Sequence, residues 1–201
     1  EINSGLFIIW PSMAHPPDCK LAAIWTIHPC LASAVGDTYA GYMTVIYHTP
    51  LSADQQRAAG LSEPQPLAMA DQVRFSDLDT NNHVNNTVYF EWFERLRIRY
   101  TQQLVARGLF DVPGPRVVIR SGSIRYLHEL LEREDYIVTC RCTSFRNTSY
   151  GLAQQVWVEG QLRATFDCVL VMLDPDGNGR YLLPDRLKRY FETNEMAKSE
   201  G

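Results

Sequence analysis

The clearest helical spacing of apolar residues lies in residues 86–107. The apolar positions recur every three or four residues, which places them on one face of a helix; they are Tyr89, Trp92, Phe93, Leu96, Tyr100 and Leu104. Gly108 follows at a position suited to end the helix, because glycine readily adopts the left-handed backbone of a C-terminal cap. The pattern predicts one long amphipathic helix.

Segments rich in β-branched and aromatic residues lie on both sides of this helix. One precedes it at residues 67–76, and four follow it at residues 116–127, 135–145, 149–158 and 161–173. Short polar or glycine-containing turns separate the last four, as is typical of strands joined by hairpins. Pro184 and Asp185 open a short terminal helix that extends to about Asn194. One long helix with an antiparallel sheet predicts the α+β class.

Charged residues are unevenly distributed along the 201-residue chain. Residues 1–50 contain only four of them, Glu1, Asp18, Lys20 and Asp37. We therefore predict a domain at residues 51–201 and an N-terminal extension of unknown role at residues 1–50. Residues 24–47 are fairly apolar, but polar and helix-breaking residues interrupt them, so we predict no membrane span. A secretory signal is the less favoured reading of the same segment.

The composition excludes some classes of protein. With 45% hydrophobic and 21% charged residues, the chain has the content of a folded globular domain rather than a disordered one. A net charge of −4 argues against a nucleic-acid-binding protein. Cys140, Cys142 and Cys168 fall in strand patterns, so we expect reduced thiols packed in the core and a cytoplasmic location. The histidines lack metal-ligand spacing, so no metal or other cofactor is predicted.

Polar residues that could carry chemistry concentrate between the first strand and the long helix. Residues 77–86 contain two carboxylates, four asparagines and one histidine. A helix N-terminus carries unpaired backbone N–H groups and a partial positive charge, so it can polarise a carbonyl oxygen and favour an ionised aspartate. Asparagine and aspartate are also the preferred helix caps, so residue type alone fits simple capping equally.

The order of these residues narrows the interpretation. It reads Asp79-x-Asn81-x-His83-Val84-Asn85-Asn86-x-x-Tyr89. This resembles the signature of hotdog-fold thioesterases, and most closely that of the branch acting on acyl-CoA and acyl-acyl carrier protein. The resemblance covers about residues 66–175 and implies a curved antiparallel sheet wrapped around one long central helix. It also implies homodimers or homotetramers with active sites at the subunit interface.

The resemblance further implies catalytic roles. Asp79 matches the carboxylate that attacks the thioester or activates water. The backbone N–H of Asn86 matches the group that polarises the thioester carbonyl, and Asn81 and His83 match residues that position groups and handle protons. Some hotdog thioesterases use a carboxylate on the helix, so Glu94 is the reserve acid or base.

Substrate contacts are expected from residues inside and outside the motif. Asn85 and Tyr89 belong to the motif, and Tyr89 could line an acyl pocket. Arg146 and Ser149 lie between two strands and could meet the phosphates or pantetheine arm of coenzyme A, since arginine suits phosphate. A plain hairpin turn explains them equally well. The acid that the carrier-protein branch places on a later strand has no counterpart in this part of the chain.

The sequence thus predicts hydrolysis of an acyl-CoA or acyl-carrier-protein thioester, with the acyl chain in a tunnel between helix and sheet. Nucleic-acid and membrane partners are not expected. One alternative is an enoyl-thioester hydratase or dehydratase, but its D-x-N-P-x-H motif contains a proline and a histidine spacing that differ from those here. Another is a non-catalytic acyl-thioester binding domain. The acyl group, the donor and the choice between nucleophile and general base for Asp79 stay open.

Overall fold

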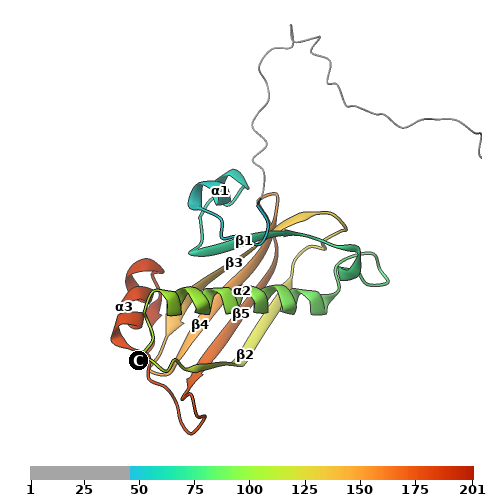
Figure 1. The fold of residues 1–201 in the computed structure, drawn as a ribbon. Coiled ribbons are helices and arrows are strands. Elements are labelled where there is room, and N and C mark those ends of the chain that lie inside the picture. Colours follow the sequence, from blue (N-terminus) through green and yellow to red (C-terminus); the bar gives the residue numbers. More distant parts are fainter. Residues whose placement is uncertain (1–45) are drawn as a thin grey trace, which may run out of the picture. The chain divides into compact units, whose positions relative to one another are not determined.

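A computed structural model describes residues 46–201 of the chain, so most of the predicted N-terminal extension lies outside the described residues. Its elements are α1 (Ala53–Ala58), β1 (Leu67–Gln72), α2 (Asn86–Ala106), β2 (Arg116–Tyr126), β3 (Asp135–Phe145), β4 (Ser149–Val158), β5 (Gln161–Leu173), α3 (Asp185–Asn194) and β6 (Lys198–Ser199) (Figure 1). The predicted α+β class is confirmed. The long helix and the last four predicted strands are confirmed to within one residue at each end.

Two sequence predictions differ from the structure. The strand predicted at 67–76 ends at Gln72, because Phe75–Asp77 form a 3-10 turn instead. Helix α1 was not predicted, because its polar sequence has no apolar period. Its start is fixed by a capping box, in which the Ser52 hydroxyl accepts from Gln55 N–H and the Gln55 side chain accepts from Ser52 N–H.

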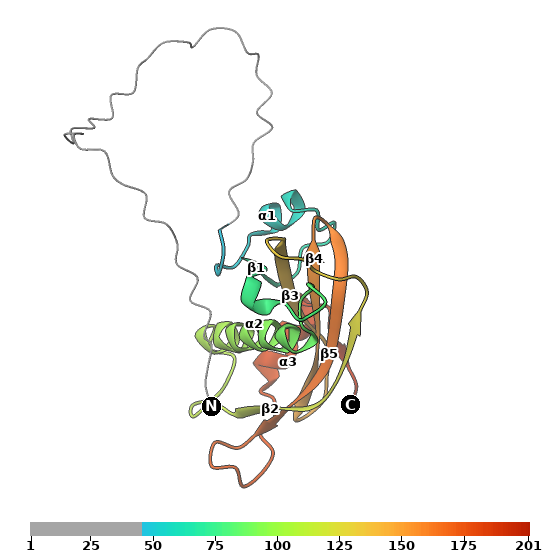
Figure 2. The same cartoon turned by 90° about the vertical axis from the view of Figure 1, so that its right-hand side faces the viewer.

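The strands form one curved sheet in the order β1-β3-β4-β5-β2, and every neighbouring pair in this order is antiparallel. The short β6 pairs with the end of β3 in parallel. Seen from the side, the sheet curves around α2, which lies along its concave face (Figure 2). This is the hotdog arrangement that the resemblance implied. The long strand β2 is left at one edge of the sheet.

The core lies between α2 and the concave face of the sheet. All six apolar positions predicted for the inner side of the helix are buried there. Trp92 stacks on Tyr136 with ring centroids 4.0 Å apart, and Phe93 stacks on Phe166 at 5.4 Å. Burial of each such side chain contributes about 1.5–3 kcal/mol, so this face holds helix and sheet together. Cys140, Cys142 and Cys168 are buried and unbridged in the same core, as predicted.

A smaller apolar cluster covers part of β1 and β3 with the segment around α1. It comprises Leu61, Ala68, Ala70 and Ile137. At its margin, Gly60 and Gly160 meet backbone to backbone, and both have positive φ, at +91° and +74°. A β-carbon on Gly60 would lie 2.8 Å from the Cα atom of Gly160, so only glycine fits this contact.

The chain after α3 is tied to the core by a buried carboxylate. Glu195 accepts from the Tyr100 hydroxyl at 2.7 Å and from Cys142 N–H at 2.6 Å. Cys142 adjoins an irregularity in the pairing of β3 with β4, and Glu195 satisfies its N–H there. Burial raises the pKa of Glu195 above its ordinary value. Among the helices of residues 46–201, none has the length and apolarity to cross a bilayer.

Candidate active site

The loop between β1 and α2 is fixed at its start by a reciprocal pair of hydrogen bonds. Arg74 N–H donates to the Asp77 carboxylate at 2.9 Å, and Asp77 N–H donates to the Arg74 carbonyl at 2.9 Å. The Asp77 carbonyl then accepts Asn85 N–H at 2.8 Å. The beginning and the end of the loop are thereby joined, and the helix N-terminus is held beside the 3-10 turn.

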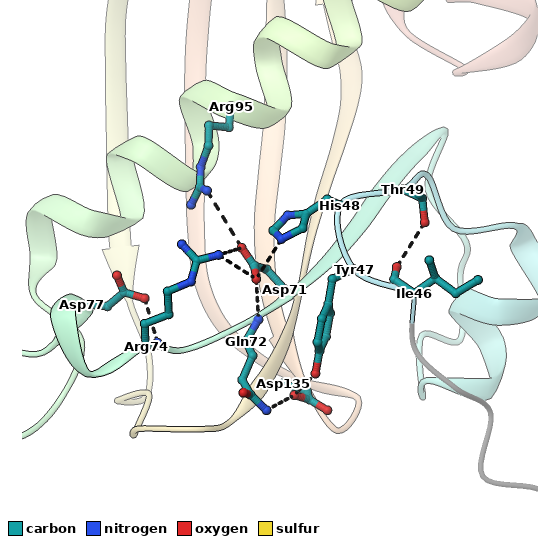
Figure 3. A network of polar contacts seen from close by, with 10 residues as sticks. All are labelled: Ile46, Tyr47, His48, Thr49, Asp71, Gln72, Arg74, Asp77, Arg95 and Asp135. Carbon is teal, nitrogen blue, oxygen red and sulfur yellow. Dashed lines mark hydrogen bonds and ion pairs between the residues drawn. The ribbon is translucent and has the colours of Figure 1, made fainter.

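A nearly buried carboxylate, Asp71, anchors this loop to the rest of the molecule (Figure 3). The Arg74 guanidinium lies 3.4 Å from it, and Arg95 on α2 lies 3.9 Å away. His48 approaches the same carboxylate at 3.6 Å. Asp71 therefore connects the end of β1 to α2 and to the segment that precedes α1.

The Asp79 side chain is held within the loop and remains one-quarter exposed. One carboxylate oxygen accepts Asn81 N–H at 2.7 Å, and the other lies 3.8 Å from Nδ1 of His83. Asp79 N–H donates to the His83 carbonyl at 2.9 Å, and Asn82 takes a positive φ of 61° to close the turn. The carboxylate thus keeps a fixed direction and stays accessible to a ligand.

The N-terminus of α2 presents one free backbone donor. Asn85 caps the helix, since its side-chain oxygen accepts from Thr87 N–H at 3.0 Å and from the Thr87 hydroxyl at 2.9 Å. The Asn86 carbonyl accepts the Tyr126 hydroxyl at 3.1 Å. Asn86 N–H donates to no acceptor among residues 46–201. A donor at the positive end of a long helix suits a developing negative charge.

A cavity of about 370 Å³ lies at this end of α2. Its lining residues are Asp79, His83, Val84, Asn86, Tyr89, Tyr126, Leu127, His128 and Glu129. The structure therefore brings together four residues predicted from the motif, which are Asp79, His83, Asn86 and Tyr89. Burial raises the pKa of Tyr89 to about 12 and also raises the pKa of Tyr126, so both hydroxyls stay protonated at neutral pH.

Apart from Val84 of the motif loop, the other lining residues come from the end of β2 and the segment after it, and sequence reasoning missed them. Glu129 supplies a second carboxylate and His128 a second imidazole. A second acid therefore reaches the cavity from the β2–β3 connection, not from residues 144–149 where it was sought. The available signal was the titratable pair His128-Glu129 directly after a strand, but only the folded chain shows that it meets Asp79.

The remaining motif and helix residues lie outside the cavity lining. Asn81 is exposed and contributes its backbone N–H to Asp79. The Asn85 side chain serves as the helix cap. Glu94 is exposed on α2, about 12 Å along the helix axis from Asn86 at 1.5 Å per residue.

Arg146 and Ser149 line a different cavity, of about 350 Å³, together with Arg120, Ser144 and Glu200. The Arg146 guanidinium is paired with the Glu200 carboxylate at 3.1 Å. The Asp79 loop follows Gln72, which pairs with Asp135 at the opposite end of β3. Ten residues of strand separate Asp135 from Phe145, roughly 33 Å. One chain therefore does not bring Arg146 to Asp79.

The side chains of the Asp79 cavity offer acid–base chemistry. Two carboxylates and two imidazoles can accept and donate protons, and one free N–H can polarise a carbonyl oxygen. Within residues 46–201, no group of three or more His, Cys, Asp or Glu side chains is placed to hold a metal ion.

Comparisons with known proteins find a family model and solved structures that this chain resembles. The family model of the thioesterase-like superfamily matches residues 73–191. A thioesterase superfamily structure from Jannaschia sp. CCS1 is 36% identical, with a TM-score of 0.68, over 76% of this chain and 97% of that one. A thioesterase from Thermus thermophilus, solved with coenzyme A and Zn, is 27% identical, with a TM-score of 0.56, over 65% and 100%. A search of curated proteins gives no match.

Proposed function

This chain belongs to the thioesterase-like superfamily, and we propose that it hydrolyses an acyl-coenzyme A thioester to a free acid and a thiol. The observation that carries the proposal is the pairing of a free donor, Asn86 N–H, with an accessible carboxylate, Asp79, in one cavity. The first group suits the carbonyl oxygen of a thioester, and the second suits attack on its carbon.

In the proposed reaction, the thioester carbonyl oxygen accepts a hydrogen bond from Asn86 N–H. One such donor typically stabilises the transition state by about 2.7–4 kcal/mol. A water oxygen bonds to the carbonyl carbon while a carboxylate takes one of its protons, the C–S bond breaks, and the departing sulfur receives a proton. Asp79 either activates this water or attacks first to form an anhydride that water then opens. His83 lies beside Asp79 and can orient it.

Coenzyme A is the proposed donor, because two arginines lie in the second cavity. Arg120 and Arg146 line it with hydroxyl groups of Ser144 and Ser149, a set that suits phosphate oxygens. The Thermus thermophilus relative was solved with coenzyme A. An acyl-carrier-protein donor is tested alongside, with the same acyl group on a carrier protein.

In a homodimer, the Asp79 cavity of one copy and the Arg146 cavity of the other copy could bind the same substrate molecule. Strand β2 is an edge strand, and its Val118 and Ile119 are 37% and 47% exposed. Antiparallel pairing of two β2 strands about their midpoint would place the start of one beside the end of the other. Ser149 and Val118 both pair with Val171, so Ser149 would lie three strand spacings, about 15 Å, from the other copy's β2, and Arg146 N–H is bonded to the Ser149 carbonyl.

The proposal is tested by thiol release from a panel of acyl-CoA esters with wild-type protein and Asp79→Asn. We expect turnover by the wild type and a loss of about a hundredfold or more in the variant, because the amide cannot accept the proton. Asp176→Asn is the matched control, since Asp176 is exposed in the turn after β5. A folded and fully active Asp79→Asn protein contradicts the role of Asp79.

A further inference from the structure

We propose that the site accepts compact acyl groups, short alkyl or single-ring aryl, and excludes long alkyl chains. The inference rests on the proposed thioester hydrolysis and deepens it. Its basis is a row of contacting aromatic rings, those of Tyr126, Tyr89, Trp92 and Tyr136, which we call the wall. It closes the Asp79 cavity on the side facing the sheet.

The wall begins at Tyr89, which lines the cavity and is only 3% exposed. Its ring lies 5.1 Å from the ring of Trp92 on one side and 5.1 Å from that of Tyr126 on the other. Trp92 in turn stacks on Tyr136 at 4.0 Å, with an angle of 21° between the ring planes. Rings in continuous contact thus separate the cavity from the interior.

The space behind this wall is filled. Phe93 and Phe166 stack there, and Tyr100 and Tyr150 are among the largest fully buried side chains. Protein interiors packed in this way have no room for an alkyl chain unless side chains move. Core side chains therefore fill the space between helix and sheet where we expected an acyl tunnel.

Beyond the Trp92–Tyr136 stack lies a small cleft, which is lined in part by the apolar side chains of Met69, Leu96 and Val138. The cleft there holds only about 60 Å³, and its lining includes Asp71, Arg95 and His48. These three side chains belong to the anchoring network around Asp71 (Figure 3). A short alkyl segment would fill this cleft, and a longer chain would have to displace or desolvate the Asp71 and Arg95 ion pair, which is costly for charged groups.

The cavity itself suits a small apolar group. Its volume of about 370 Å³ lies near the lower end of the range for ligand sites, and it must also hold the thioester. Beside its polar groups it presents Val84, Leu127 and the rings of Tyr89 and Tyr126. The two tyrosine rings meet edge to face, a geometry that a third ring could extend.

The test compares kcat/KM for acetyl-, butyryl-, benzoyl-, octanoyl- and palmitoyl-CoA. For the wild type we expect butyryl or benzoyl to exceed octanoyl and palmitoyl by about tenfold or more. Tyr89→Leu and Trp92→Leu should each raise the octanoyl-to-butyryl ratio by about tenfold, because they open the wall. Tyr190→Leu is the matched control: it removes a partly buried ring that packs on Arg107 at the other end of α2, and it should leave the ratio unchanged.

Each outcome separates this inference from the proposed function. Preference of the wild type for palmitoyl-CoA overturns the inference but leaves thioester hydrolysis in place. Hydrolysis of no ester overturns both. Circular dichroism verifies that the leucine variants are folded. If folded variants keep the wild-type octanoyl-to-butyryl ratio, the wall does not limit the length of the acyl chain. If a leucine variant does not fold, the wild-type ranking alone decides.

Discussion

Tyr126, at the end of the edge strand β2, donates a 3.1 Å hydrogen bond to the carbonyl of Asn86, the first residue of α2. This bond connects a strand at the sheet edge to a residue that lines the cavity and whose N–H has no acceptor among residues 46–201. The neighbouring backbone is fixed as well, since Asn85 N–H is bonded to Asp77 and Val84 N–H to Leu130. The donor is thus preorganised by three separate parts of the chain.

We therefore expect Tyr126→Phe to lower kcat by about tenfold with a much smaller change in KM, because a looser donor chiefly weakens transition-state stabilisation. The free energy of unfolding should fall by only about 1 kcal/mol, the typical worth of one hydrogen bond. Steady-state kinetics and urea titration check both. Tyr181→Phe is the control, because its hydroxyl bonds Asp111 N–H away from the cavity. Equal losses of kcat in the two variants would show that Tyr126 does not position the site.

The second cavity predicts an effect on substrate affinity. Arg146→Ala should raise KM for an acyl-CoA by about tenfold and leave kcat nearly unchanged, because a charge-assisted contact to phosphate is lost. The same acyl group on pantetheine, which lacks the nucleotide phosphates, should show no such change. Glu200→Gln should lower KM for the acyl-CoA, since it frees Arg146 from its ion pair.

The control for this pair is Arg189→Ala, which removes the same charge from an exposed position on α3. A KM increase of the same size with the pantetheine ester would locate Arg146 away from the phosphates. An acyl-CoA KM that stays constant in both Arg146→Ala and Glu200→Gln would exclude this cavity from substrate binding.

We expect Glu195 to make the free energy of unfolding depend on pH. Burial raises its pKa in the folded state above 4.5, so the folded protein binds this proton more tightly than the unfolded chain. Its contribution is complete below pH 4.5 and is lost as the pH rises through the folded-state pKa. In Glu195→Gln the amide can bond both Tyr100 and Cys142 without titrating. The wild type should therefore lose stability relative to this variant by at most about 1.4 kcal/mol per pH unit.

Urea unfolding of both proteins from about pH 4 to about pH 8 measures this difference directly. Other carboxylates titrate alike in the two proteins, so they cancel in the comparison. Parallel stability profiles over the whole range would show that Glu195 titrates alike in folded and unfolded chains.

We expect replacement of Gly160 by alanine to lower the stability of the fold through a steric clash. Gly160→Ala would place a β-carbon 2.9 Å from the Gly60 carbonyl oxygen at a φ of +74°. Gly108→Ala is the matched control, because Gly108 has a φ of +69° and no atom within 4 Å of the added β-carbon. We expect about 1–2 kcal/mol of destabilisation for the control from the backbone alone, and clearly more for Gly160→Ala. Thermal unfolding compares the two, and equal losses would mean that the Gly60 contact relaxes freely.

The fold and the motif residues of the cavity could be predicted from the sequence because their signals are local. The apolar period from Tyr89 to Leu104 defines α2, and the alternation within residues 149–158 and its neighbours defines the strands. Asp79 and Asn86 lie seven residues apart on one loop and helix start, so their proximity follows from the chain itself. The exact end of β1 could not be predicted, because it depends on the hydrogen bond from Arg74 N–H to the Asp77 carboxylate. The spacing of apolar residues does not indicate such a bond.

The tertiary structure alone decided which distant residues complete the site. Glu129 lines the same cavity as Asp79 because β2 and its following segment end beside the helix N-terminus, while Arg146 lies at the other end of β3. The stacking of Trp92 on Tyr136 likewise depends on the tertiary structure, because the amphipathic pattern does not show which rings meet. Periodicity reports which face of an element is buried, whereas partners across a sheet and the volume left between them depend on strand order, register and side-chain packing.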